Sequence, residues 1–255
     1  YRSYSFFLKG YMKKILLILF SLLFYSLSFA TPLFKQGNVV RLTATGGTAS
    51  YTSNVTAGSV LFGIGFFEDN VSDISSITDT RGNTWVQFRS FYSYFDIDGG
   101  VNNRIVIWKT SNTTTAGANT LTVNWTGGGT ALNLHLLEYS IAAPTNLDGS
   151  SISAAWADDP TSGNVTTTQA GDLLIGFCVN NGGDATPPAG YTSRTTHVFN
   201  KYTQVFDKVA GAAGTENQQI TTVSTNRGIN TLFAITDGAA TGGGGYKKLI
   251  LLGAD

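Results

Sequence analysis

The chain has 255 residues, of which 13% are charged, and its 16 basic and 16 acidic residues balance. The first thirty residues hold Arg2, Lys9, Lys13 and Lys14 and no acid, so the rest of the chain carries 12 basic against 16 acidic residues, a net charge of −4. No run of Lys or Arg remains that could follow a phosphate backbone. We therefore do not expect this chain to bind nucleic acid. Ser, Thr, Asn and Gly are abundant, as is typical of strands and turns.

The N-terminal segment Met12–Ala30 has the layout of a Sec signal peptide. A basic start is followed by an apolar stretch from Ile15 to about Phe24 and by the small-residue end Ser28-Phe29-Ala30. A membrane anchor is the alternative, but this stretch is shorter than the roughly 20 residues that a bilayer requires. We therefore expect cleavage after Ala30, a secreted or cell-surface protein, and no stable membrane span. Residues 1–11 are interpreted as an upstream extension of translation.

Short segments rich in Val, Ile, Phe and Thr then alternate with turn residues, which predicts strands. The strand Thr120–Thr126 has the clearest alternation, with Leu121, Val123 and Trp125 on one face and Thr and Asn on the other. The turn Asp79–Trp85 contains Gly82, which can adopt positive φ. The other strands expected in the first part of the chain are Asn38–Thr45, Val60–Phe67, Trp85–Phe95, Arg104–Thr110 and Ala131–Tyr139.

The same run of elements returns about a hundred residues later. Phe206 lies 98 residues after Trp108, Val223 lies 98 after Trp125, Leu232 lies 96 after Leu136, and Gly171 lies 113 after Gly58. The larger separation at the glycines indicates that the first copy and its connection together hold insertions that the second copy lacks. The sequence therefore predicts an all-β fold, an antiparallel jelly-roll-like β-sandwich of ten or so strands built from two related halves. Two separate immunoglobulin-sized sandwiches are the alternative.

These boundaries follow from the repeat. The sandwich is expected over residues 31–238, with half one at 38–140, a crossover at 141–164 and half two at 165–237. A Gly-rich linker and a tail occupy 239–255, and the segment 246–252 is either a final strand or an element for strand addition to another chain, which predicts a homo-oligomer.

The segments Ile77–Trp85, Val106–Trp125, Leu136–Ser140 and Ala170–Phe177 resemble a widespread group of secreted bacterial and phage-borne β-sandwich surface modules. These modules share a D-x-x-G-N-x-aromatic turn and an E-Y strand. The resemblance implies a β-sandwich in an exported surface protein, near adhesive or carbohydrate-related modules. Members are mostly of unassigned function, so the resemblance supplies no catalytic residue.

Three residues with ionisable side chains are considered as candidates for catalysis or metal binding. Glu138 shares a strand face with three leucines and is the one candidate for a catalytic acid in a glycan-active hydrolase. The alternative, which we favour, is a strand-end acid bonded to a Tyr or a backbone amide. Cys178 lies in an apolar run and is expected to be a small buried side chain. His135 alternates with leucines and is expected to face solvent, and with one Cys and two His no zinc pattern exists.

Two binding sites are also considered. Trp85, Tyr92 and Tyr94, with Phe88, could form an aromatic platform for sugar rings, with polar groups such as Arg89 nearby, although aromatic residues are more often core. Asp96 and Asp98 could bind Ca²⁺ in a loop, although Asp also favours turns without a metal. No other cofactor is expected.

The function expected from these observations is an exported, non-enzymatic surface module for binding or display. Its partner would be a glycan or a protein surface, as for an adhesin-like or carbohydrate-binding module. A phage virion or tail-associated structural protein and a glycan-active hydrolase are the alternatives.

Overall fold

The computed structural model describes residues 31–236, apart from gaps at 44, 68–71, 94–102, 112, 114, 128–130, 142–146, 153–158, 200 and 222–227. The predicted extension, signal peptide and tail therefore lie outside the described residues. Within the described part every regular element except isolated bridges and turns is a β-strand, which confirms the all-β prediction. That part also contains no helix long and apolar enough to cross a membrane.

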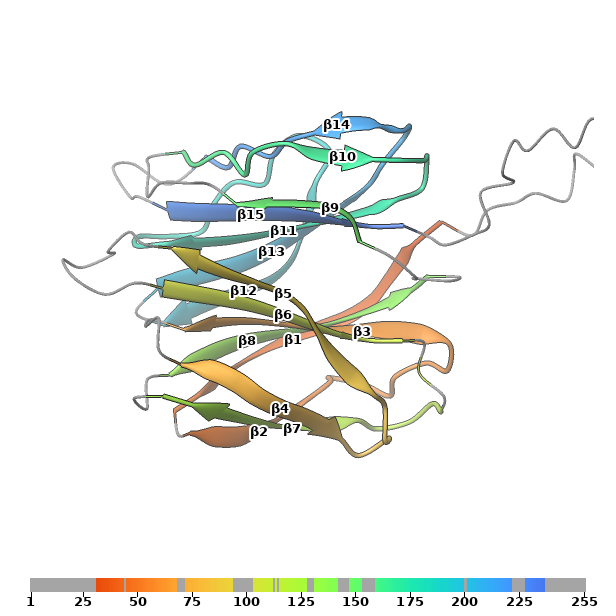
Figure 1. Cartoon of the computed structure of the whole chain (residues 1–255), viewed down its shortest axis with the longest axis vertical. Helices are drawn as coiled ribbons and strands as arrows, with labels where there is room; N and C mark the ends of the chain where they lie inside the picture. The colour runs from red at the N-terminus through yellow and green to blue at the C-terminus, as the bar shows by residue number, and fades with distance from the viewer. Residues whose placement is uncertain are drawn as a thin grey trace, which may run out of the picture. The chain divides into compact units, whose positions relative to one another are not determined.

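Fifteen strands in the described residues form four antiparallel sheets, more than the ten or so predicted (Figure 1). The first outer sheet has the order β2-β7-β4, the first central sheet β1-β8-β3-β6-β5, the second central sheet β12-β13-β11-β15-β9, and the second outer sheet β10-β14. Half one contains β1 (Leu33–Leu42), β2 (Gly46–Ser50), β3 (Ser59–Phe67), β4 (Asp73–Asp79), β5 (Trp85–Ser93), β6 (Asn103–Thr110), β7 (Thr120–Thr126) and β8 (Leu132–Ser140). Half two contains β9 (Leu147–Ile152), β10 (Val165–Thr167), β11 (Leu173–Asn180), β12 (Thr192–Phe199), β13 (Lys201–Val209), β14 (Gly214–Glu216) and β15 (Gly228–Ile235).

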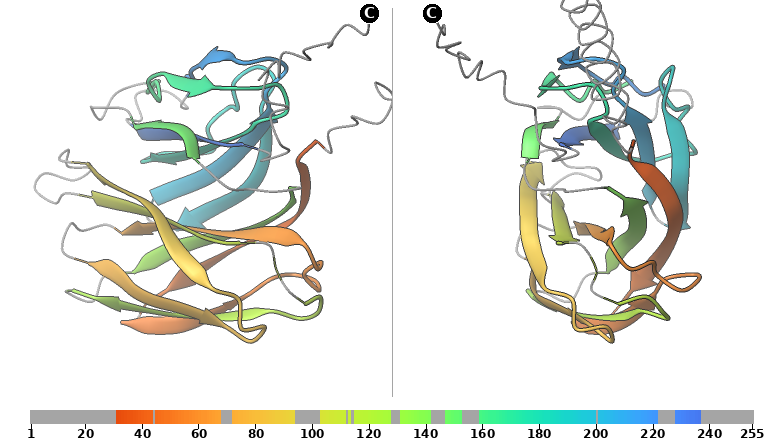
Figure 2. Two further views of the ribbon diagram at one scale, coloured as in Figure 1. Left: turned by 45° about the vertical axis from the view of Figure 1, so that its right-hand side comes forward. Right: turned by 90° about the vertical axis from the view of Figure 1, so that its right-hand side faces the viewer.

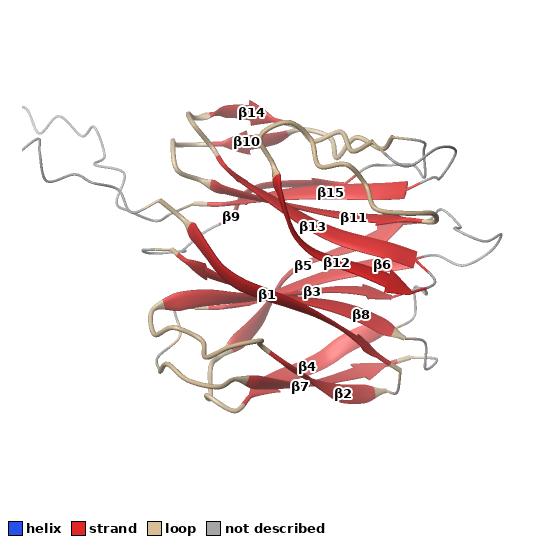
Figure 3. Ribbon diagram, turned by 180° about the vertical axis from the view of Figure 1, so that it is seen from behind, coloured by secondary structure: helices blue, strands red, loops and turns tan. Residues whose placement is uncertain are grey.

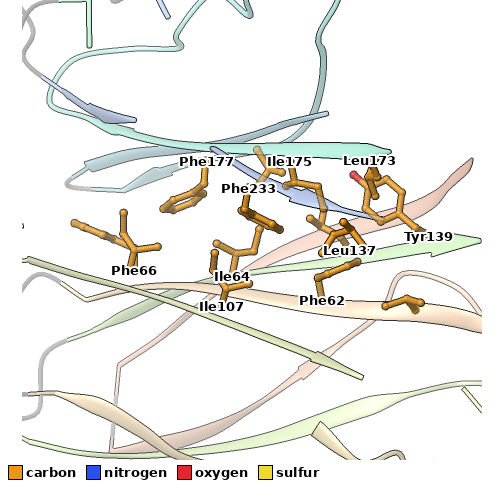
Figure 4. Close-up of a cluster of buried hydrophobic side chains, with 14 of the residues drawn as sticks. Phe62, Ile64, Phe66, Ile107, Leu137, Tyr139, Leu173, Ile175, Phe177 and Phe233 are labelled. Atoms are coloured by element: carbon orange, nitrogen blue, oxygen red, sulfur yellow. The ribbon is translucent and has the colours of Figure 1, made fainter. Parts of the chain in front are cut away.

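The four sheets are stacked in that order, with a hydrophobic core between each neighbouring pair (Figures 1 and 2). The middle core joins the two halves, and Figure 4 shows Phe62 and Tyr139 of half one packed toward Phe177 and Phe233 of half two. Because each central sheet is covered on both sides, β3, β8, β11 and β15 are buried on both faces apart from one end residue of β8. Burial on both faces is why these strands read as almost continuous apolar runs.

The two central sheets have the same strand order when the second is read from its other end, from β9 to β12. This shared order confirms that the fold is built from two related halves. In half one, Gly63 of β3 lies opposite Trp108 of β6. In half two, Gly176 of β11 lies opposite Phe206 of β13. The separation of 98 residues between Trp108 and Phe206 thus joins structurally equivalent positions.

Half one contains one strand that has no counterpart among the described residues of half two. Strand β4 forms the edge of the first outer sheet, whereas the second outer sheet has only an isolated bridge between Thr186 and Thr221 at the corresponding edge. Pro187 and Pro188 follow directly, and proline has no N–H to extend such pairing. The segment that carries β4 therefore supplies only part of the extra residues of the first copy, and the connection from β5 to β6, which is longer than that from β12 to β13, supplies the rest. Strand β9 lies within the segment expected as a crossover and pairs with β15.

The apolar run of β11 contains Cys178, which is fully buried as predicted. Burial raises the pKa of its thiol to about 12, although a hydrogen bond from Asn180 acts in the opposite direction. The thiol is therefore protonated at neutral pH, and Cys178 acts as a core side chain.

Candidate functional site

The carboxylate of Glu138 is fully buried on β8 and faces the first outer sheet, as its spacing from the three leucines predicted. Gln36 Nε2 of β1 donates to its Oε2 at 2.6 Å, and the backbone N–H of Thr56 donates to its Oε1 at 2.7 Å. The amide oxygen of Gln36 in turn accepts from the N–H of Ser53 at 2.8 Å. Both oxygens of Glu138 therefore help to fix the loop after β2, which is the structural alternative that the sequence offered.

A second carboxylate organises the turn between β4 and β5. Asp79 Oδ1 accepts from the N–H groups of Arg81 and Asn83, and its Oδ2 accepts from the side chains of Asn83, Trp85 and Asn119 at 2.8–3.1 Å. Burial acts to raise the pKa of Asp79, but these hydrogen bonds outweigh it, and the pKa lies below its usual value. The D-x-x-G-N-x-aromatic motif is therefore a folding motif in this chain.

The aromatic residues considered for a sugar platform do not lie on one surface. Trp85 is buried in the core beneath the first outer sheet. Phe88 lies at a β-bulge and packs toward half two, with its ring 5.8 Å from that of Phe233. The bulge inserts one residue, which changes the face for the residues that follow. The structure thus separates Trp85 from Phe88.

The other predicted binding residues are only partly described. Arg89 is exposed on β5, and Tyr92 lies in the same strand, opposite Arg104, with a side chain outside the described part. Tyr94, Asp96 and Asp98 lie outside the described residues. Among those that are described, no group of three or more His, Cys, Asp or Glu side chains is placed to hold a metal ion.

The histidine predicted to face solvent is instead buried between the two halves, and that prediction was wrong. His135 Nδ1 lies 2.7 Å from Thr195 Oγ1, and its Nε2 lies 2.8 Å from Thr203 Oγ1. Its ring meets Phe177 edge to face at 5.4 Å. Burial, and then the positive charge of His197, lowers the pKa of His135 to about 3, so the ring is neutral at ordinary pH. Alternation along β8 could not reveal that a second sheet covers this face.

A second polar contact joins the halves at the other end of β8. The hydroxyl of Tyr139 donates to Asp207 Oδ2 at 2.8 Å, and Arg194 Nε donates to the same oxygen at 2.7 Å. The guanidinium also lies over the ring of Phe34, 4.4 Å from its centre. Burial, and then the charge of Asp207, raises the pKa of Tyr139 well above its usual value. Both contacts fix the relative position of the two central sheets.

Around Thr122, the outward face of the first outer sheet carries small, uncharged side chains. Thr48, Thr122 and Thr78 lie side by side on β2, β7 and β4, and Asn124 lies beside Ser76. Asn124 Nδ2 donates to Ser76 Oγ at 3.1 Å. The alternation in β7 indicated that this strand has such a face. Nothing in the sequence indicated that β2 and β4 extend the face on either side of β7. Its outward positions are Gly46, Thr48, Ser50, Ser76, Thr78, Thr120, Thr122, Asn124 and Thr126.

An acid at the edge of this face, opposite Thr126, is paired with a cation. Asp73, at the start of β4, accepts from Arg104 Nη2 at 2.7 Å.

Comparisons with protein-family models, with curated proteins and with solved structures find no match for this chain. Function must therefore be inferred from the side chains themselves.

Proposed function

We propose that the mature chain is an exported, non-enzymatic binding module that holds a neutral, hydroxyl-rich surface, such as an insoluble polysaccharide, against its first outer sheet. The observation that supports this proposal is the aligned Ser, Thr and Asn face around Thr122. Export rests on the predicted signal peptide.

Three properties of this face suit such a ligand. Hydroxyl and amide groups both donate and accept hydrogen bonds, so they can match the hydroxyl groups of a sugar in either role. Ser and Thr are short, and the β-branched Thr is stiff, so little side-chain entropy is lost on binding. The uncharged side chains around Thr122 favour a neutral polymer over an anionic one, since the chain after Ala30 has a net charge of −4.

The placement of the carboxylates supports binding over hydrolysis. Glycoside hydrolysis requires two carboxyl groups that act directly on the sugar. Here Glu138 fixes a loop, and Asp79 fixes a turn. Neither lies on the Ser, Thr and Asn face.

A depletion assay with particles of cellulose, chitin and starch tests the proposal. We expect the mature chain to be retained by at least one of these neutral polysaccharides and not by the anionic polymer pectate. Thr122→Glu places a charge at the centre of the face, and we expect binding to weaken at least about tenfold. Thr192→Glu is the matched control, because Thr192 is exposed on β12 of the other half.

Three outcomes would contradict the proposal. The first is a chain that is retained by none of the three polysaccharides. The second is equal retention of the Thr122→Glu variant and the unchanged chain. The third is retention by ice crystals or by a protein surface and by none of the polysaccharides. The Thr122→Glu and Thr192→Glu variants would show whether that retention uses the same face.

A further inference from the structure

The layer between the two central sheets contains an asparagine whose polarity the packing does not use. Asn133 of β8 is fully buried, and neither its amide nitrogen nor its amide oxygen has a hydrogen-bond partner. It precedes His135 by two residues, so both side chains point from the first central sheet toward half two. A buried amide without hydrogen-bond partners costs stability.

The duplication shows that the fold does not require an amide at this position. The residue of half two at the equivalent place is Ile229, because Gly63 lies opposite Leu136 and Gly176 lies opposite Leu232, 96 residues later. Ile229 is buried in the same central core. An apolar side chain therefore fits this position in one copy, whereas Asn133 keeps two hydrogen-bonding atoms there in the other.

Two basic side chains share this layer with the amide. Arg41 of β1 is the cross-strand partner of Asn133, and the two therefore share a face. From the opposite sheet comes His197, the cross-strand partner of Thr203, whose hydroxyl reaches His135. Burial and the charge of Arg41 lower the pKa of His197, and the charge of His197 lowers that of His135.

The contacts between edge strands bring these residues together. Strands β1 and β12 are adjacent edge strands of the two central sheets, and Figure 3 shows them running side by side. Their approach is close, because a Cβ atom at Gly37 would lie 2.7 Å from Thr195 Cγ2. Arg41 and His197 are partly exposed and lie toward the ends of these strands, so both side chains reach solvent at this end of the layer.

We infer that Arg41, Asn133 and His197 form a binding site for an oxyanion group, a carboxylate, sulfate or phosphate, at the end of the layer between the two halves. The anion places its charge between the guanidinium and the imidazole, and Asn133 Nδ2 donates to one of its oxygens. His197 Nδ1, which is buried and has no hydrogen-bond partner, supplies a second donor once it is protonated. The site takes residues from both halves, so it exists only when they are packed together.

The sharpest test follows the titration of His197 by NMR in sulfate, phosphate or acetate, with chloride at equal ionic strength as the reference. A bound anion favours the protonated imidazole, so we expect the pKa of His197 to rise by about half a unit or more in at least one of the three. Calorimetric titration with the same anions gives the affinity. The free ion and the acidic sugar glucuronate share this chemistry but differ in size. Comparing the affinities of the two distinguishes a site for small ions from a site for an acidic sugar.

Substitutions separate binding from packing. Asn133→Ile introduces the residue found in the other half, and we expect it to unfold at an equal or higher temperature while anion binding weakens at least about tenfold. Arg41→Gln should weaken binding similarly. Lys35→Gln is the control, since Lys35 is an exposed cation on the same strand, and it should leave binding unchanged.

Two results would overturn the inference. One is a His197 titration that is the same in chloride and in all three oxyanions. The other is an Asn133→Ile or Arg41→Gln variant that keeps the full anion-dependent shift. If Asn133→Ile does not fold, Arg41→Gln still decides the question, because it removes the charge without changing the core.

Discussion

The burial of His135 makes a quantitative prediction about acid stability. The pKa of this imidazole falls from 6.5 to about 3 because the ring is buried between the halves and lies near the positive His197. An unfolded chain exposes the same side chain, which then titrates near its ordinary value of about 6.5. Between these two values only the unfolded state binds the proton, so the folded state loses stability as the pH falls.

The magnitude follows from the width of that window. One pKa unit corresponds to about 1.4 kcal/mol, so by pH 5 the free energy of unfolding should have fallen by about 2 kcal/mol through His135 alone. The loss should reach about 4 kcal/mol at pH 3 and level off near about 5 kcal/mol below that pH. Above the unfolded pKa the contribution is fully present, and the stability should be independent of this residue's titration.

The perturbation that isolates this effect is His135→Gln. An amide does not titrate and can still bond to the hydroxyl of Thr195 or Thr203, although we expect some loss of stability at every pH. Urea unfolding of both proteins at pH 7, 6 and 5, in chloride buffers, gives the free energy of unfolding. Because the carboxyl groups are the same in both proteins, their contributions cancel in the difference.

The expected result is a slope that differs between the two proteins. Between pH 7 and pH 5 the unchanged chain should lose about 2 kcal/mol more than His135→Gln. The reasoning would be refuted by equal slopes, or by an NMR titration that places the pKa of His135 in the folded chain near 6.5. His197→Gln is a useful comparison, since that ring is only partly buried and its own titration adds to the slope.

Three further predictions concern single positions, with urea unfolding as the measurement. Gly63→Ala should be tolerated, since its new Cβ would meet atoms no closer than 3.6 Å. At the equivalent position, the Cβ of Gly176→Ala would overlap the buried amide of Gln218, which should lower the free energy of unfolding by about 1–3 kcal/mol. Shortening Gln218 to Ala should remove that penalty, and an equal effect of the two glycine changes would contradict this account. Asp79→Asn should cost about 2 kcal/mol at pH 7, because an amide cannot accept all five hydrogen bonds, and the difference should shrink as the pH falls below about 4. Glu138→Gln should cost about 1–3 kcal/mol by turning one acceptor into a donor, and an unchanged stability would show that this carboxyl does not anchor the loop.

Local pattern in the sequence was sufficient for several features of the fold. The alternation of Leu121 and Val123 with Thr122 predicted β7 at its observed bounds, because side chains on a strand point to opposite faces in turn. The repeat predicted that Trp108 and Phe206 are equivalent, and both lie opposite a glycine in the central strand of their sheet. Burial of Cys178 followed from its apolar surroundings.

Other features depended on the packing of sheets. The two faces of β8 looked different in the sequence, yet both are buried, because one contacts the first outer sheet and the other contacts half two. His135 was therefore placed in solvent by the alternation. At Phe88 a β-bulge changed the face that the ring occupies, and no residue pattern marked the position of that bulge.

The sequence by itself determined the strands, their alternation and the existence of two copies, since these depend on contacts within a strand or on direct comparison of segments. Only the tertiary structure decided that the copies pack through their central sheets, and so brought Arg41 and Asn133 of one half near His197 of the other. The physical reason is that alternation tells which side chains share a face of a strand. What covers that face depends on residues about sixty to seventy positions away along the chain.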